Sequence, residues 1–215
     1  MIIASDLNGT LTTGAPALAV TEWIRTYQPD RYPLLYKYRL LISYLRVKFG
    51  WIAVDIWADK VLREVLSLIQ FPDQNILDSI MKYVVESELW PKRRKDVIAL
   101  LQDYHTKGAE IIIISAAYEP AVKIFAQLIG KDRVTGIGTP VRLTENGLTL
   151  AEKLTVRELK LKRIYESIGS RHLDIALGDT SGDIPMLEKS REPIAVYPDK
   201  NLRSVAESRS WKILE

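Results

Sequence analysis

Two short apolar runs in this chain lead into aspartates and then break at glycine. The run 2–4 leads into Asp6, and the run 173–177 leads into Asp179, with Asp183 shortly after it. Each pattern predicts a buried strand followed by a tight turn. Because ligands collect at the carboxyl ends of strands in a parallel α/β sheet, we expect the three aspartates to converge. Clustered carboxylates repel one another, so the sequence predicts a cation among them, and oxygen ligands favour Mg²⁺.

Strand and helix patterns alternate in the second half of the chain. The predicted strands are 111–114, 135–139, 173–177 and 194–197, the predicted helices are 96–105, 120–129 and 156–168, and 143–150 is predicted to form a hairpin or flap. Alternation of this kind indicates a parallel sheet covered by helices on both faces. The predicted fold class is therefore α/β, with a Rossmann-like parallel sheet as its core.

The region 13–95 has a different character, because helical periodicity dominates it. Apolar residues recur with helical spacing in 34–45, 54–69 and 76–89. We therefore expect an all-helical cap over 13–95, inserted into a core formed by 1–12 and 96–215.

The bulk composition excludes several classes of function. A formal net charge of +3 gives no reason to expect nucleic-acid binding, and the absence of cysteine excludes disulfides, thiolate chemistry and cysteine-ligated zinc. The first residues contain no basic region or cleavage site, and no apolar run is long enough to span a bilayer. These observations lead us to expect a cytoplasmic protein.

One segment of the predicted cap is unusually basic. Residues 31–48 contain five lysines or arginines and no acid, interleaved with tyrosines. We favour a solvated helix face with snorkelling side chains. The alternative is contact with an anionic membrane surface or with a bulky anionic substrate.

The polar residues at the predicted strand ends form a set suited to phosphoryl transfer. Asp6 could attack phosphorus and form an acyl phosphate that water later cleaves. Charge then spreads over the phosphoryl oxygens, which need donors and cations. Ser115 at the end of the strand 111–114, a lysine and a carboxylate-held Mg²⁺ would supply them. The expected partner is a small phosphorylated substrate.

This order of motifs resembles the haloacid dehalogenase superfamily, specifically its phosphoserine-phosphatase-like branch with a helical cap. The resemblance covers the whole chain. The motif 178–187 is its most specific part, the motif 5–12 is specific apart from one position, and the motif 114–117 is only moderately specific. It implies a Mg²⁺-dependent phosphatase. The residue roles that it implies are Asp6 as nucleophile and metal ligand, Asn8 as a backbone-carbonyl metal ligand, Thr10 as loop support, Ser115 and the Ala116 amide as phosphate donors, and Asp179 and Asp183 as Mg²⁺ ligands.

Three of these assignments have alternatives. The family's helix-starting lysine corresponds best to Lys160, which is followed by helical apolar spacing, and the alternative is Lys153. Asp183 could instead cap the helix that begins at Ile184-Pro185. The hydroxyl of Ser115 could merely satisfy backbone groups at a strand end.

Asn8 is the main departure from the family pattern, which has a second aspartate at this position. That aspartate protonates the leaving oxygen and activates water, and an amide can do neither, so about 10²–10⁴-fold of acid–base help is lost. Either the leaving group needs no acid, or another group or water replaces it, or the protein binds a phosphorylated ligand with weak or no turnover. Phosphoserine itself is a doubtful substrate, because Glu22 is the nearest acid after the first motif.

Overall fold

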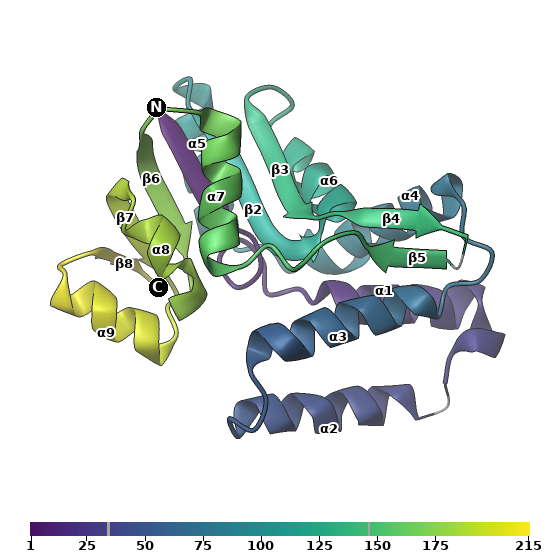
Figure 1. Cartoon of the computed structure of the whole chain (residues 1–215). Coiled ribbons are helices and arrows are strands. Elements are labelled where there is room, and N and C mark those ends of the chain that lie inside the picture. Colours follow the sequence, from purple (N-terminus) through teal and green to yellow (C-terminus); the bar gives the residue numbers. More distant parts are fainter. Residues whose placement is uncertain (34, 146) are drawn as a thin grey trace.

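The structure is a computed structural model that describes residues 1–33, 35–145 and 147–215. Its centre is a six-stranded sheet of order β3-β2-β1-β6-β7-β8, in which every neighbouring pair is parallel (Figure 1). The strands are β1 Ile2–Asp6, β2 Glu110–Tyr118, β3 Val134–Thr139, β6 Leu173–Gly178, β7 Ser190–Val196 and β8 Lys212–Leu214. The predicted α/β class with a Rossmann-like parallel sheet is confirmed.

Helices cover both faces of this sheet, because successive strand residues point to opposite sides. Ile111 and Ile113 pack into one buried cluster, and Ile112 and Ile114 pack into the other. The helices of the core are α5 Lys95–Thr106 and α6 Glu119–Ile129 on the first side, and α7 Arg157–Ile168, α8 Ile184–Leu187 and α9 Lys200–Ser208 on the second. A strand buried on both sides explains the unbroken isoleucine run of β2.

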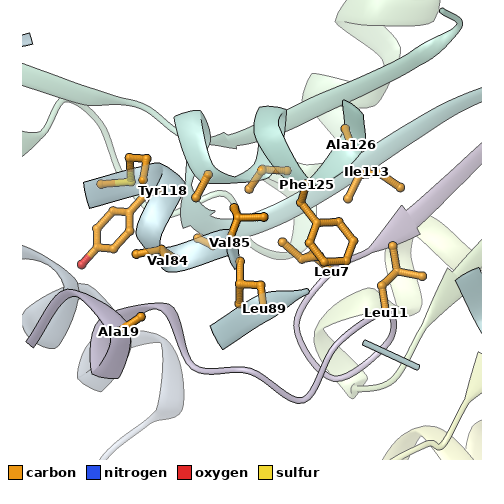
Figure 2. Packing of buried hydrophobic residues seen from close by; sticks show 14 of the residues in the cluster. Leu7, Leu11, Ala19, Val84, Val85, Leu89, Ile113, Tyr118, Phe125 and Ala126 are labelled. Carbon is orange, nitrogen blue, oxygen red and sulfur yellow. The ribbon is translucent and has the colours of Figure 1, made fainter. Parts of the chain in front are cut away.

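A helical insertion lies between β1 and β2, as the sequence predicted. Its elements are α1 Pro16–Tyr27, the 3₁₀ turn η1 Pro29–Arg31, α2 Tyr36–Lys48, α3 Val54–Ser67, α4 Gln74–Tyr83 and the π-helical segment η2 Val84–Leu89. Figure 2 shows Val84 of this insertion near Tyr118, and Leu89 near Leu7 and Phe125 of the core. The insertion and the sheet therefore share one hydrophobic core.

Several predicted elements differ from the structure at their ends. The predicted strand 111–114 continues to Tyr118 as part of β2, with a change of register to β3 after Ile114. The predicted helix 76–89 divides into α4 and η2. The predicted hairpin is present as β4 Val141–Thr144 and β5 Gly147–Leu150, which pair antiparallel. Leu34 and Asn146, which belong to the predicted helix and hairpin, lie outside the described residues.

Apolar periodicity did not reveal α9 and β8. Helix α9 is mostly polar and buries only Leu202 and Ala206 among its described residues. Its start is set instead by Asp199, whose side chain accepts a hydrogen bond from the Leu202 amide at 2.7 Å. Strand β8 has three residues at the sheet edge, too few for an alternating pattern to stand out.

Phe125 gives a test of the shared core. Its side chain is fully buried in α6, with its ring 5.3 Å from that of Trp90 in an edge-on arrangement. Phe125→Ala should lower the free energy of unfolding by about 3–5 kcal/mol, because it leaves a cavity. Leu128→Ala on the same helix, where Leu128 is 42% exposed, should change it by less than about 1 kcal/mol. Equal losses in urea unfolding would contradict this description of the core.

Candidate active site

The polar strand ends meet because β1 lies between β2 and β6. Asp6 is the last residue of β1 and is paired with Ile114, directly before Ser115. Asp179 follows the end of β6 on the other side of β1. The side chains of Asp6, Ser115 and Asp179 therefore all lie at the carboxyl edge of the sheet.

Asp6, Asp179 and Asp183 form one acidic cluster, as the sequence predicted. One oxygen from each carboxylate lies within 4.8 Å of the others. Asp6 and Asp183 are 5% and 1% exposed, so most of this charge is removed from water. Buried like charges are unfavourable unless cations compensate for them.

Lys160 of α7 supplies part of that compensation. Its Nζ lies 2.5 Å from Asp6 Oδ1 and 2.6 Å from Asp183 Oδ1, and the side chain is buried. Burial favours a lower pKa for Lys160, but the carboxylates of Asp183 and Asp6 raise its pKa above the ordinary value. Lys153, the alternative from the sequence, lies on an exposed stretch before α7. The geometry thus brings Lys160 to the acidic cluster.

Gly9 allows the Asp179 carboxylate to approach the loop that follows β1. Gly9 has φ +100°, and a Cβ there would lie 1.9 Å from Asp179 Oδ2. Beside it, Thr10 Oγ1 donates a hydrogen bond of 3.0 Å to Asp179 Oδ1. Gly9, which the sequence indicated as part of a turn, is therefore also needed because any larger residue there would collide with the Asp179 carboxylate.

Asp183 both caps a turn and contacts the cluster. Its Oδ2 accepts hydrogen bonds from the amide and the hydroxyl of Thr180, each at 3.2 Å, at the start of the 3₁₀ turn η3 Ser181–Asp183. Its Oδ1 accepts from Lys160. The capping alternative is wrong for the helix α8 Ile184–Leu187, because the Asp183 side chain makes no cap hydrogen bond there. It instead completes the capping box of η3, whose N-cap is Thr180.

Asn8 is fixed by two hydrogen bonds made by its side chain. Its Oδ1 accepts from Ser115 Oγ at 3.0 Å, and its Nδ2 donates to the Gly14 carbonyl at 3.0 Å. Ser115 Oγ in turn accepts from the Ala117 amide at 3.1 Å. Ala116 lines the same cavity as Asn8 and Ser115. The candidate phosphate-binding residues are thus adjacent to Asp6.

The acidic cluster changes the proton affinity of its members. Burial raises the pKa of Asp6 to about 6, with Lys160 opposing and Asp183 adding to the rise. Burial also raises the pKa of Asp179 to about 8, reinforced by the charges of Asp6 and Asp183. The carboxylates therefore gain from a further cation.

The residues present fit a divalent cation. Asp6 Oδ2 is buried and accepts no hydrogen bond from any described residue, and it belongs to the same carboxylate that Lys160 holds through Oδ1. Asp179 contributes a second carboxylate whose ionised form is disfavoured by its neighbours. Hard oxygen donors with excess negative charge are the groups that suit Mg²⁺.

Sequence reasoning missed the residues that fix the junction between insertion and core. The basic run 92–95 predicts either a solvated junction or a helix start, and α5 does begin at Lys95. Arg94 in this run donates from Nε to the Gly9 carbonyl at 2.8 Å and stacks 3.7 Å from the centre of the Tyr197 ring. Glu88 of η2 accepts from the Ala15 amide at 2.9 Å. The only signal in the sequence was the basic run 92–95, which does not specify a partner.

The acidic cluster opens into a cavity of 1240 Å³ between the core and the insertion. Its core side is formed by Asp6, Asn8, Ser115, Lys160 and the turn after β6, and its other side by residues of α1, α2 and α3. The insertion therefore covers the carboxyl edge of the sheet.

The basic segment 31–48 lies largely on α2, whose Arg39, Arg46 and Lys48 are exposed. Within the described part of the chain, no helix combines the length and apolar content needed to cross a membrane. The solvated helix face therefore stays a prediction, with contact with an anionic membrane surface or a bulky anionic substrate as its alternative.

Comparisons with known proteins support the fold and the family. Residues 3–188 match the family described as haloacid dehalogenase-like hydrolase. The chain is 31% identical over 126 residues to the "Inhibition of morphological differentiation protein" of Streptomyces azureus, covering 56% of this chain and 45% of that protein. It is 25% identical over 125 residues to a histidinol-phosphatase of Neisseria meningitidis, covering 54% and 55%. The chain thus aligns with about half the length of these curated relatives.

Solved structures share the architecture at low identity. A Bordetella pertussis protein of unknown function has a TM-score of 0.80 at 18% identity, covering 100% of this chain and 97% of that chain. A substrate-bound phosphoserine phosphatase has a TM-score of 0.62 at 14% identity, covering 100% and 92%. These likenesses establish the fold.

Lys160 and Lys153 can be separated by paired substitutions. Lys160→Met leaves Asp6 and Asp183 buried without their ammonium partner, and it should lower the free energy of unfolding by roughly 3–5 kcal/mol. Lys153→Met, at an exposed position, should change it by no more than about 0.5 kcal/mol. Urea unfolding without divalent cation measures both. A Lys160→Met variant as stable as the parent would contradict the assigned ion pairs.

Asp179→Asn tests whether the excess negative charge of the acidic cluster destabilises the metal-free protein. Because the pKa of Asp179 is raised, its ionised form costs stability, and this cost grows as pH rises from about 4 to about 8. The variant should therefore unfold at a higher temperature than the parent at pH 8 without metal, by a few degrees. It should also lose most of the stabilisation by millimolar Mg²⁺. Asp132→Asn, at an exposed carboxylate, should behave like the parent in both respects.

Proposed function

Because the chain belongs to the haloacid dehalogenase-like hydrolase family, we propose that it is a Mg²⁺-dependent phosphatase acting on a small phosphorylated substrate. The observation that carries this proposal is the convergence of Asp6, Asp179, Asp183 and Lys160, of which Asp6, Asp183 and Lys160 line the cavity. The similarity to a histidinol-phosphatase and to a phosphoserine phosphatase structure agrees with it.

The nucleophile in this proposal is the carboxylate of Asp6. One of its oxygens bonds to phosphorus as the bond between phosphorus and the leaving oxygen breaks, which gives an aspartyl-phosphate and releases the leaving group. Water then attacks that phosphorus, the bond to Asp6 breaks, and inorganic phosphate leaves. Lys160 holds Asp6 in place through both steps and stabilises negative charge on the phosphoryl oxygens.

Ser115 and Ala116 are proposed to bind the phosphoryl group. Ser115 Oγ donates to Asn8 Oδ1 and accepts from the Ala117 amide beside Asp6, so its hydroxyl proton would turn from Asn8 to a phosphoryl oxygen when substrate binds. The backbone amide of Ala116 would supply a further donor. Thr10 supports the loop by holding Asp179.

Mg²⁺ would be held by Asp6 and Asp179, with the Asn8 backbone carbonyl as a further oxygen ligand. Asp183 has hydrogen bonds on both oxygens, so its main contribution would be to orient Lys160 and the turn after Asp179. When bound, the ion neutralises charge on the phosphoryl oxygens and on the carboxylates.

Asn8 limits the rate at which this site can cleave phosphate esters, because it cannot act as a general acid. Both ends of its amide are already bonded, and an amide does not exchange a proton near neutral pH. The leaving oxygen must therefore depart as a stable anion or take its proton from water, which favours acyl or aryl phosphates. The same residue supports a second candidate, a phospho-ligand-binding or regulatory protein with weak or no turnover.

We propose that residues 13–95 act as the cap and that 1–12 and 96–215 form the catalytic core. The cap would exclude water from the bound phosphate, as lids over such sites commonly do. Arg157 Nε donates to Asp55 Oδ2 at 2.8 Å, a contact between α7 and α3 that holds the two parts together beside the cavity.

Phosphate release from 4-nitrophenyl phosphate tests the function. We expect Mg²⁺-dependent release by the parent chain and none above background from Asp6→Ala. Asn8→Asp should raise kcat by about tenfold or more on an unactivated alkyl phosphate, whose leaving oxygen needs a proton, and by less on 4-nitrophenyl phosphate. Its new carboxyl would face the Gly14 carbonyl, a contact that favours the protonated form needed by an acid. Release that is equal in Asp6→Ala and the parent would refute the phosphatase and leave the binding protein.

A further inference from the structure

The cavity above Asp6 is larger than a phosphate group requires. Its volume of 1240 Å³ exceeds the roughly 300–1,000 Å³ of ordinary small-ligand sites. Asp6, Ser115 and Lys160 occupy one side, and the opposite side is formed by α1, α2 and α3. A substrate can therefore extend from the phosphate site far into the cap.

The cap side of the cavity exposes large apolar side chains. Leu18, Leu41, Tyr44 and Val54 all line it, and each is between 51% and 56% exposed. Apolar surface inside a cavity is stabilised when an apolar ligand displaces water from it. The position of these four side chains thus favours a substrate whose body is apolar.

The charged cap residues along the cavity do not suit a second anionic group. They are Glu22, Asp55 and Glu88, which contact Arg25, Arg157 and Lys92 respectively. No lysine or arginine of the described cap residues lines the cavity. Arg157 of the core also lines the cavity, and its guanidinium is bonded to Asp55. A nucleotide, a bisphosphate or a phosphorylated acid would bring a second negative charge to a cap wall whose described charged residues are all acids.

The outer surface of the same cap region has the composition of a lipid-facing surface. Phe49 and Trp51, at the connection between α2 and α3, are 68% and 76% exposed, and the segment 31–54 contains no acid. Helix α2 is the outermost element of the cap (Figure 1). Aromatic and basic residues together are typical of surfaces where amphiphiles concentrate.

We propose that the substrate is a phosphorylated amphiphile, with its phosphate at Asp6 and a long alkyl or acyl chain lying against Leu41, Tyr44 and Val54. This rests on the proposed phosphatase function, and it assigns the substrate class that the cap selects. The reaction consumes water: the bond between phosphorus and the leaving oxygen breaks, and the chain leaves with that oxygen, as an alcohol, a phenol or a carboxylate.

Chain length at constant leaving-group chemistry tests the proposal. The substrates are 4-ethylphenyl and 4-octylphenyl phosphate, used with Mg²⁺ below the micelle concentration. Each buried methylene improves binding roughly two- to fourfold, so six added methylenes should raise kcat/KM at least about fiftyfold. Equal kcat/KM values for the two esters, or a higher value for phosphoserine than for the octyl ester, would overturn the proposal.

Two cavity variants and one matched control locate the effect. Val54→Asn places a polar group on the cavity wall and should reduce the octyl-to-ethyl ratio at least about fivefold, and Leu41→Asn should do the same. Ile56→Asn lies on the same helix, and Ile56 is 67% exposed and does not line the cavity, so the ratio should stay as in the parent. A ratio that none of the cavity variants changes would show that the chain binds elsewhere and overturn the proposal.

Calorimetry separates failure of this inference from failure of the proposed function. If the parent chain releases phosphate from no ester, including 4-nitrophenyl phosphate, the phosphatase proposal fails. The dissociation constants of the two alkylphenyl phosphates then decide the ligand class. Octyl binding at least about fiftyfold tighter than ethyl binding would support an amphiphilic ligand, and equal affinities would overturn it.

Discussion

Two buried carboxylates and one half-buried carboxylate share a small space with one ammonium group, and the rest of the site depends on this imbalance of charge. Lys160 bonds to Asp6 and Asp183, and the ionised form of Asp179 is disfavoured enough to raise its pKa to about 8. The parallel order of β2, β1 and β6 forces the three acids to the same edge. A fold that tolerates such a cluster gains stability from any bound cation, so metal binding and the stability of the site are linked.

Asn8 shows how one substitution can preserve geometry and change chemistry. Its amide supports both Ser115 and the loop at Gly14, so it holds in place the residues that we propose bind phosphate. The group that would exchange a proton is missing. Rate at this site must then depend on the leaving group, and selectivity must depend on the cavity that the cap forms over Asp6.

The acidic cluster could be predicted from the sequence because it follows from local patterns and one topological rule. Asp6 and Asp179 each end an apolar run, and parallel strands place such ends together. Lys160 could be ranked above Lys153 from helical spacing, but only the structure shows its contacts with Asp6 and Asp183.

The cap and the junction could not be predicted to the same depth. Helical periodicity showed that the cap is helical, but the cavity wall combines Leu18, Leu41 and Val54 from three helices whose packing angles no local pattern specifies. The contact of Arg94 with the Gly9 carbonyl joins residues far apart in the sequence. The short strand β8 and the polar helix α9 are held by their neighbours, so their own sequences contain little signal.

The position of a bound divalent cation tests the central claim most directly. Crystals of the protein grown with Mn²⁺ as a substitute for Mg²⁺ would show the ion by anomalous diffraction. The account predicts a peak bound by the carboxylates of Asp6 and Asp179, next to Asp183 and Lys160. Crystals that bind Mn²⁺ elsewhere while this space holds no peak, or in which Asp6 and Asp179 lie apart, would contradict it.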